Sequence, residues 1–118
     1  YQGDPLRHYQ CLDLLLIPSV NEGLSNCALE AMSCGVPVLS NRNCGAEELI
    51  MDSADGFVRG METPPDLADI LFEIVGQGSG ALAEVGTRAR QKVQDAFSMS
   101  SMADSYLRIY QEIMGINA

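Results

Sequence analysis

The chain has 118 residues, of which 47% are hydrophobic and 19% are charged, so it has enough apolar sequence for one packed domain and too little length for two. Its formal net charge is −9, from 16 acidic and 7 basic residues. This charge argues against nucleic acid or an anionic membrane as the main partner, because both require a basic surface. A small phosphate-bearing ligand remains compatible with it, since one helix N-terminus can hold a phosphate locally.

The first half of the chain alternates strand-like and helix-like segments. In order, these are a helix begun by Pro5, a strand over 12–17, a loop over 19–25, a helix over 26–33, a strand over 36–40, a helix over 46–51 and a strand over 56–58. The run over 12–17 is almost wholly apolar, which is typical of a parallel strand buried on both faces. The alternation predicts an α/β fold, a Rossmann-like parallel sheet flanked by helices, of which only about three strands are present.

Helices fill the second half of the chain. Apolar residues at helical spacing predict one helix from Leu67 to Ile74, one from Leu82 to near Phe97, and a closing helix over 98–114 that Ser98 caps. The apolar stripe of the closing helix consists of Met99, Met102, Tyr106, Ile109 and Ile113. Without repeats or clear linkers, residues 1–118 are expected to form a single domain fragment.

The cysteines and the single histidine do not suggest a metal site. None of the four cysteines belongs to a Cys-x-x-Cys pair. Cys27 and Cys34 are seven positions apart, on one face of the predicted helix, and small buried thiols in a cytoplasmic protein are expected. His8 is expected to be a structural or surface residue. No apolar run approaches the ~20 residues of a membrane span, and no signal peptide opens the sequence.

The stretch over 18–38, PSVNEGLSNCALEAMSCGVPV, places a Gly-containing loop between a buried strand and a helix. In open α/β sheets, ligands bind beyond the carboxyl ends of the strands. The backbone N–H groups of Leu24, Ser25 and Asn26 would then lie at the start of the helix, where the helix dipole favours an anion. The sequence therefore predicts a phosphate site here, with Ser25 or Asn26 as the N-cap.

Two carboxylates flank this predicted phosphate site. Glu22 lies in the loop, and Glu30 lies just over one turn into the helix, among small or apolar neighbours. An ionised carboxylate in such a core-like position needs hydrogen-bond donors, and the vicinal hydroxyls of a sugar supply two. The alternative is that both acids are solvated, Glu22 in its loop and Glu30 on a half-exposed helix, because two acids at this spacing are common.

The motif as a whole resembles a known family. Its pattern is Glu22-Gly23-x-x-Asn26-x-x-Leu29-Glu30-Ala31-Met32-x-x-Gly35-x-Pro37-Val38. This pattern is similar to the Glu-x7-Glu signature of retaining glycosyltransferases of the GT-B fold, in the family 4-like group (group 1). The flanks agree, since the strand over 11–19 and the segment from Phe97 to Tyr110 resemble the family's corresponding strand and closing helix. Cys44 departs from the pattern, because a glycine is usual there.

The resemblance implies a role for each matching residue. Glu22 would contact the donor sugar near the reacting centre as the catalytic residue, and Glu30 would bind the ribose hydroxyls. The other donor-binding positions would be Gly23, Leu24, Ser25 and Asn26, through backbone groups or support of the helix start. Glu48 matches a further acidic position of the family, for which a structural role is expected.

The resemblance also implies an activity and partners for the intact enzyme. It would transfer a hexosyl group from a nucleotide diphosphate sugar with retention, without a metal or other cofactor. The chain would be the carboxyl-terminal part of the nucleotide-sugar-binding lobe, inactive alone because the basic residues that neutralise the diphosphate lie elsewhere. Its partners would be the nucleotide sugar and the missing N-terminal lobe, but no nucleic acid. Self-association is expected through an exposed sheet edge or the closing helix.

Two other interpretations remain open at this stage. One is a non-catalytic α/β interaction or regulatory module, and the other is a degenerate transferase lobe kept for binding or assembly. A response-receiver-like module would need paired acids at the end of a strand, whereas Asp13 precedes its strand. Binding of nucleotide sugars separates the transferase from the interaction module.

Overall fold

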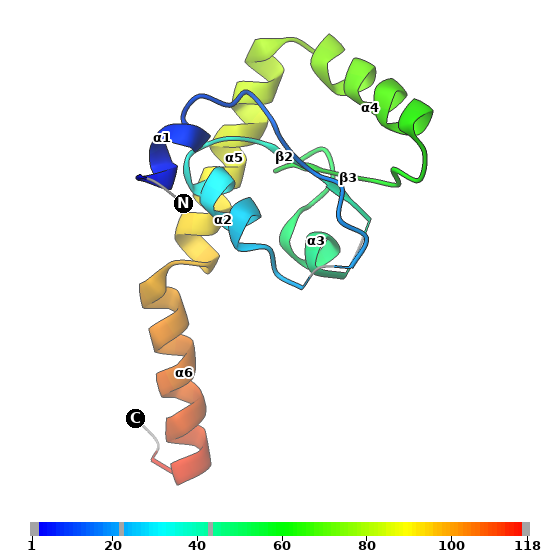
Figure 1. Cartoon of the computed structure of the whole chain (residues 1–118). Helices are drawn as coiled ribbons and strands as arrows, with labels where there is room; N and C mark the ends of the chain where they lie inside the picture. Colours follow the sequence, from blue (N-terminus) through cyan, green and yellow to red (C-terminus); the bar gives the residue numbers. More distant parts are fainter. Residues whose placement is uncertain (1–2, 22, 43, 117–118) are drawn as a thin grey trace.

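The computed structural model describes residues 3–21, 23–42 and 44–116, which form a parallel sheet with helices packed around it (Figure 1). The elements are α1 (Pro5–Tyr9), β1 (Leu15–Ile17), α2 (Asn26–Ser33), β2 (Val38–Asn41), α3 (Cys44–Leu49), β3 (Phe57–Arg59), α4 (Pro64–Gly76), α5 (Ser79–Ala96) and α6 (Met99–Met114). Within the described range the sheet has three strands in the order β1-β2-β3, all parallel. The predicted α/β class with a Rossmann-like, partial sheet is therefore confirmed.

The sheet carries a hydrophobic cluster on each face, because successive strand side chains point to opposite sides. Val38 and Val58 belong to the cluster that contains the buried residues of α2 and α3. Leu39 and Phe57 belong to the second cluster, together with Ile74 of α4. The sheet is thus covered on both faces, as expected of parallel strands.

β1 differs from the strand predicted over 12–17. It begins only at Leu15, and its three residues are partly rather than fully buried. Within the described residues, β1 pairs with β2 and forms one edge of the sheet. Side chains of this segment pack on both faces of the sheet, Leu15 and Ile17 on one cluster and Leu14 and Leu16 on the other. The strand is shorter and less buried than predicted, because an edge strand has a neighbouring strand on one side only.

The helix boundaries follow the capping residues closely. Asp4 accepts the Leu6 N–H before α1, and Ser98 accepts the Ser101 N–H before α6. Before α4, Thr63 and Asp66 form a reciprocal capping box. These polar side chains satisfy N–H groups that lack an intrahelical acceptor. α1, α2 and α6 begin where the sequence predicts, whereas α3, α4 and α5 begin two or three residues earlier than predicted.

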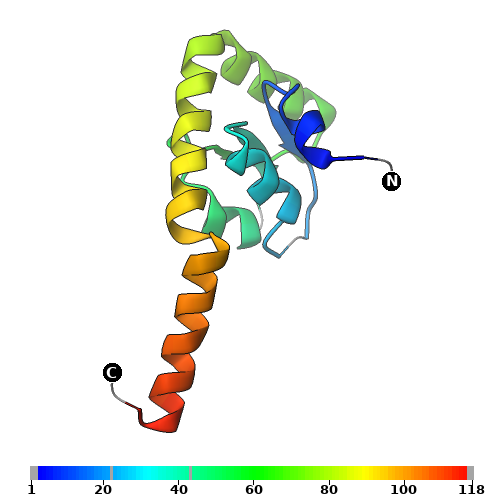
Figure 2. The same ribbon diagram turned by 90° about the vertical axis from the view of Figure 1, so that its left-hand side faces the viewer.

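α5 connects the two hydrophobic clusters, whereas α6 leaves the body of the protein (Figure 2). Leu82 and Val85 of α5 belong to one cluster, and Ala89 and Val93 to the other. α6 buries none of its described residues, and its departure gives the molecule extents of 55 × 30 × 29 Å. The predicted stripe of α6 is therefore present but exposed.

The thiols lie largely at the surface. Cys11 and Cys27 are exposed, Cys34 is partly buried, and all three are free. The prediction of buried thiols was wrong for the first two, because the buried stripe of α2 consists of Ala28, Ala31 and Met32 and Cys27 lies beside it. None of the described helices combines the length and the apolar character that crossing a bilayer requires.

Candidate functional site

The candidate site lies where the carboxyl ends of β1 and β2 meet the start of α2. A narrow cleft there is lined by strand residues Ile17 and Ser40 and by Gly23 and Ser25 from the segment before α2. The rest of its lining consists of Ala28, Gly45, Ala46, Leu49 and Ile50. Its interior volume is only about 10 Å³, close to the space one water occupies. A ligand of the size of a sugar nucleotide would therefore lie over this cleft rather than inside it.

Ser25 is the N-cap of α2, as one of the two predicted alternatives. Its backbone is extended, with φ −78° and ψ 116°, and its Oγ accepts the backbone N–H of Ala28 at 3.4 Å. The N–H groups of the first helical turn have no intrahelical acceptor, and the helix dipole makes this end positive. Asn26, at the first helical position, is exposed, and Leu24 is 48% exposed. The start of α2 is therefore exposed to solvent.

Glu22, the predicted catalytic residue, lies outside the described residues. Its neighbour Gly23 is exposed and lines the cleft. The other predicted donor-binding residues, Gly23, Leu24, Ser25 and Asn26, are consecutive in the chain and lie at the start of α2.

Glu30 is exposed, in contrast to the core-like position on which its prediction partly depended. On α2 it lies one turn after Asn26 and away from the buried stripe. It lines a separate shallow hollow of about 140 Å³, together with Tyr9 and Ser33. The argument that a buried carboxylate requires a ligand's hydroxyls was therefore wrong, because this carboxylate keeps its contact with water. Its role in binding ribose remains a prediction that depends on the resemblance.

Tyr9 is a neighbour of Glu30 that sequence reasoning did not assign to the site. Burial, more than any other cause, raises the pKa of the Tyr9 hydroxyl, and hydrogen bonding with Glu30 and Cys27 and their charges raise it further. The side chain is partly buried against the hydrophobic cluster under α2. In the sequence, Tyr9 precedes the predicted strand over 12–17 and lies outside the motif, so no pattern there indicated a role in the site.

Asn41 is a second residue that sequence reasoning left unassigned. It ends β2, is 8% exposed, and uses its amide to join three segments at the carboxyl edge of the sheet. Its Nδ2 donates to the Pro18 carbonyl oxygen at 3.5 Å, and its Oδ1 accepts the backbone N–H groups of Arg42 at 2.9 Å and Met61 at 3.2 Å. Asn41 therefore ties the chain after β1 to the chain after β3.

The remaining charged candidates lie at the periphery. Arg42 has a side chain that is 68% exposed and forms an ion pair with Glu47 at 3.7 Å. Glu48 and His8 are also exposed. Over residues 3–21, 23–42 and 44–116, no group of three or more His, Cys, Asp or Glu side chains is arranged to hold a metal ion.

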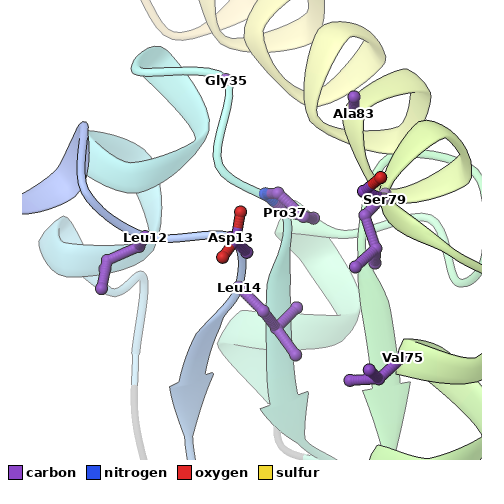
Figure 3. A pocket seen from close by; sticks show the side chains of 9 residues that line it. Leu12, Asp13, Leu14, Gly35, Pro37, Val75, Ser79 and Ala83 are labelled. Atoms are coloured by element: carbon purple, nitrogen blue, oxygen red, sulfur yellow. The ribbon is translucent and has the colours of Figure 1, made fainter.

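A larger cavity lies at the opposite end of the sheet, where β1 and β2 begin (Figure 3). It has a volume of about 440 Å³, and Leu14, Pro37 and Val75 are among its lining residues. Its lining is mostly apolar, with Asp13 and Ser79 as the polar side chains. Because ligands of α/β sheets bind beyond the carboxyl ends of the strands, we assign the candidate site to the start of α2 and not to this larger cavity.

Comparison with known proteins identifies the family of the chain and its fold. The family model described as "Glycosyl transferases group 1" matches residues 1–77. A D-inositol 3-phosphate glycosyltransferase of Saccharomonospora viridis is 32% identical over 111 residues, which cover 94% of this chain and 25% of that protein. The chain spans about a quarter of the length of the curated relatives it matches.

Solved structures share the fold. A structure of Anabaena Alr3699/HepE in complex with UDP-glucose superposes with a TM-score of 0.84 at 21% identity, covering 95% of this chain and 31% of that one. The C-terminal domain of a glycosyl transferase group 1 family protein from Francisella tularensis gives a TM-score of 0.68 at 23% identity, covering 78% of this chain and 47% of that one. The architecture is thus that of a partial lobe of the GT-B glycosyltransferases.

Proposed function

This chain belongs to the group 1 family of glycosyl transferases, and from this premise we propose that it forms part of the donor-binding lobe of an enzyme that uses a nucleotide diphosphate sugar. The reaction is the transfer of a hexosyl group to an acceptor hydroxyl with retention at the anomeric carbon. The donor-lobe role is supported by the likeness to a C-terminal domain of a family member and to a structure that contains UDP-glucose.

The observation that carries the proposal is the start of α2, capped by Ser25 and open to solvent beyond the carboxyl ends of β1 and β2. Backbone N–H groups and the helix dipole favour the diphosphate there without any basic side chain. In this proposal Gly23, Leu24 and Ser25 present backbone groups to the diphosphate or sugar, and Asn26 supports the helix start.

The two acids have different roles in this proposal. Glu22 contacts the donor sugar next to the reacting carbon. Glu30 accepts hydrogen bonds from the two ribose hydroxyls, for which its exposed position on the same helix leaves access. Retention, independence of metal ions and a cytoplasmic location are parts of the same proposal.

The chain by itself is proposed to be inactive. In this reaction, stabilising the negative charge of the departing diphosphate is a large part of catalysis, and preorganised positive groups provide this stabilisation. Arg42 lies near the site, but it forms an ion pair with Glu47 and its side chain is 68% exposed. It is therefore not a preorganised positive group for the diphosphate. In a longer protein, the N-terminal lobe would provide the acceptor site and further contacts. Turnover of a nucleotide sugar by the purified chain would contradict this part of the proposal.

Exposed apolar surfaces support the proposed protein partners. Tyr106, Ile109 and Ile113 of α6 are 57%, 51% and 76% exposed. Such a stripe, like the free edge of β1, is an association surface. We propose that in a longer protein α6 packs partly towards the N-terminal lobe, whereas the edge of β1 pairs with the remaining strands of the donor lobe. The isolated chain self-associates through one of these two surfaces. Light scattering tests this: the double variant Tyr106→Ser/Ile113→Ser lowers the average mass if α6 is the contact, while an unchanged monomer in every form contradicts self-association.

The proposed donor site is tested by calorimetric titration of the chain with UDP-, GDP- and ADP-sugars. We expect one of these to bind, and Glu30→Gln to weaken that binding about tenfold, because a charged hydrogen bond contributes about 1.5–3 kcal/mol. Glu84→Gln on α5 is the matched control, since its side chain is 79% exposed and distant in sequence from the site. No binding of any of the three nucleotide-sugar classes would contradict the proposed function.

A further inference from the structure

We propose that Asn41 is a positioning residue, whose side-chain amide holds the chain that leaves β1 and thereby sets the position of the segment 18–25 before α2. This inference rests on the proposed function, because it concerns the segment to which that function assigns contacts with the donor. It adds the end of β2, outside the Glu-x7-Glu motif, to the machinery of the site.

Asn41 lies at the carboxyl end of the central strand of the described sheet. In the register of the sheet, Ser40 is level with Ile17 of β1, and Asn41 is level with Arg59 of β3. The chain leaves β1 at Pro18, which has no backbone N–H to donate to the ladder. Just beyond the last paired residues, the side chain of Asn41 contacts this departing chain.

Three hydrogen bonds fix the orientation of the Asn41 amide. Its Oδ1 accepts the backbone N–H groups of Arg42 at 2.9 Å and Met61 at 3.2 Å. Its Nδ2 donates to the Pro18 carbonyl oxygen at 3.5 Å. These partners leave one assignment of the amide, because an N–H group only donates and a carbonyl oxygen only accepts. The two shorter bonds hold Asn41 to the chain after β2 and β3, so its Nδ2 presents a fixed donor to Pro18.

The segment 18–25 depends on polar anchors of this kind. Its apolar side chains Val20 and Leu24 are 71% and 48% exposed, so burial of apolar surface does little to hold it. Its far end is fixed where Ser25 caps α2, and Asn41 holds its near end. Gly23, which lines the cleft, lies between these two anchors.

A segment that is held at both ends binds a ligand better than a free one. Ordering a segment on binding costs conformational entropy for each residue that becomes fixed. Where Asn41 orders the chain beforehand, part of this cost falls on folding instead of binding. The proposed contacts of Gly23, Leu24 and Ser25 are with the diphosphate or the sugar. Asn41 therefore acts on this end of the donor, and not on its nucleoside.

The test separates the two ends of the donor. Asn41→Asp keeps the size of the side chain and an acceptor oxygen, but replaces the donor to Pro18 with a carboxylate oxygen. Gln77→Glu is the matched control, because it makes the same change from amide to carboxylate at an exposed position between α4 and α5. Titration followed by NMR measures the dissociation constants of UDP-glucose, GDP-mannose and ADP-glucose, and of UMP, GMP and AMP.

We expect Asn41→Asp to weaken the nucleotide sugar that binds about fivefold and the matching monophosphate less than twofold. Fivefold corresponds to about 1 kcal/mol, the net contribution of one hydrogen bond. Gln77→Glu is expected to change both affinities by less than twofold. In the ligand-free Asn41→Asp variant, the amide resonances of Val20 and Gly23 should move, while that of Ile74 in the second hydrophobic cluster stays in place.

A second variant separates positioning from charge repulsion and from a general loss of structure. Asn41→Ser removes the amide without adding a charge, so it is expected to give the same pattern, and it serves alone if the carboxylate prevents folding. Weakening by Asn41→Asp alone, equal weakening of both ligands by Asn41→Ser, or no weakening by either variant overturns the inference, while wild-type binding leaves the proposed function intact. If the wild-type chain binds none of the nucleotide sugars, the proposed function fails, and this inference fails with it.

Discussion

α5 and α6 are consecutive helices of 18 and 16 residues, and both carry apolar residues at helical spacing. α5 buries Leu82, Val85, Gly86, Ala89 and Val93, whereas α6 buries none of its described residues. The difference lies partly in side-chain size: Gly86 and Ala89 let α5 approach its neighbours closely, while the stripe of α6 is made of large residues. An amphipathic pattern therefore predicts that a helix has a partner, but not whether the same chain supplies it.

The largest predicted effect concerns Gly86, where α5 lies against the backbone of Gly35. A Cβ at Gly86 would lie 2.0 Å from the Gly35 carbonyl oxygen and 3.2 Å from Pro37 Cδ. Because the obstacle is backbone, we expect Gly86→Ala to lower the free energy of unfolding by about 3 kcal/mol or more.

The control for this variant lies in the same helix. A Cβ at Gly80 would meet nothing within 4 Å. Gly80→Ala is therefore expected to raise stability by up to about 1 kcal/mol through helix propensity. Urea unfolding measures both variants, and an equal response of the two positions would contradict the close packing of α5.

The same substitution in both helices sharpens the comparison. Leu82 of α5 is 7% exposed, and Leu107 of α6 is 57% exposed. We expect Leu82→Ala to cost about 2–4 kcal/mol of unfolding free energy, because it removes buried apolar surface and leaves a cavity. Leu107→Ala is expected to change it by less than about 0.5 kcal/mol. Similar losses, measured at a concentration where the chain is monomeric, would mean that α6 packs on the body.

A charged contact of α5 gives a smaller effect. Asp55 is 8% exposed and accepts the Lys92 ammonium at 2.9 Å and the Met51 N–H at 2.7 Å. Asp55→Ala should cost about 2 kcal/mol, because it leaves a partly buried cation and an N–H group without their acceptor. Glu84→Ala, which removes the exposed contact of Arg88 and Glu84 at 4.0 Å, should cost less than about 0.5 kcal/mol, and urea unfolding measures both variants.

The smallest predicted effect concerns alkaline pH. The folded-state pKa of Tyr9 is raised above its ordinary value of 10.0, by burial first and then by Glu30 and Cys27. Between the unfolded and the folded pKa, the folded state holds more protons, so stability is fully present below about pH 10 and falls as the pH rises above it. Tyr9→Phe should flatten this part of the pH–stability curve, and Tyr106→Phe should not. Parallel curves for all three proteins would contradict the coupling of α1 to α2.

The sequence predicted the helices and strands better than it predicted which of their residues are buried. The starts of α1, α2 and α6 were predicted correctly, because Asp4, Ser25 and Ser98 cap backbone N–H groups that are close to them in the chain. Burial was harder: the run over 12–17 was expected to be a buried strand, but β1 has three residues that are only partly buried, and Glu30 was expected in a core-like setting but is exposed. Both errors have one cause, since the apolar pattern does not say which faces other segments reach. Tyr9 and Asn41 were missed because their contacts join segments whose proximity only the fold establishes.

The central claim is that the start of α2 is the donor site, and amide chemical shifts during titration with a nucleotide sugar test it most directly. UDP-glucose is the first probe, followed by GDP- and ADP-sugars. The account predicts that the shifts of Gly23, Leu24, Ser25 and Asn26 move with saturation while those of Leu14, Leu82 and Ala83, around the larger cavity, stay in place. Movement confined to the larger cavity, or no movement with any of these donors, would contradict it.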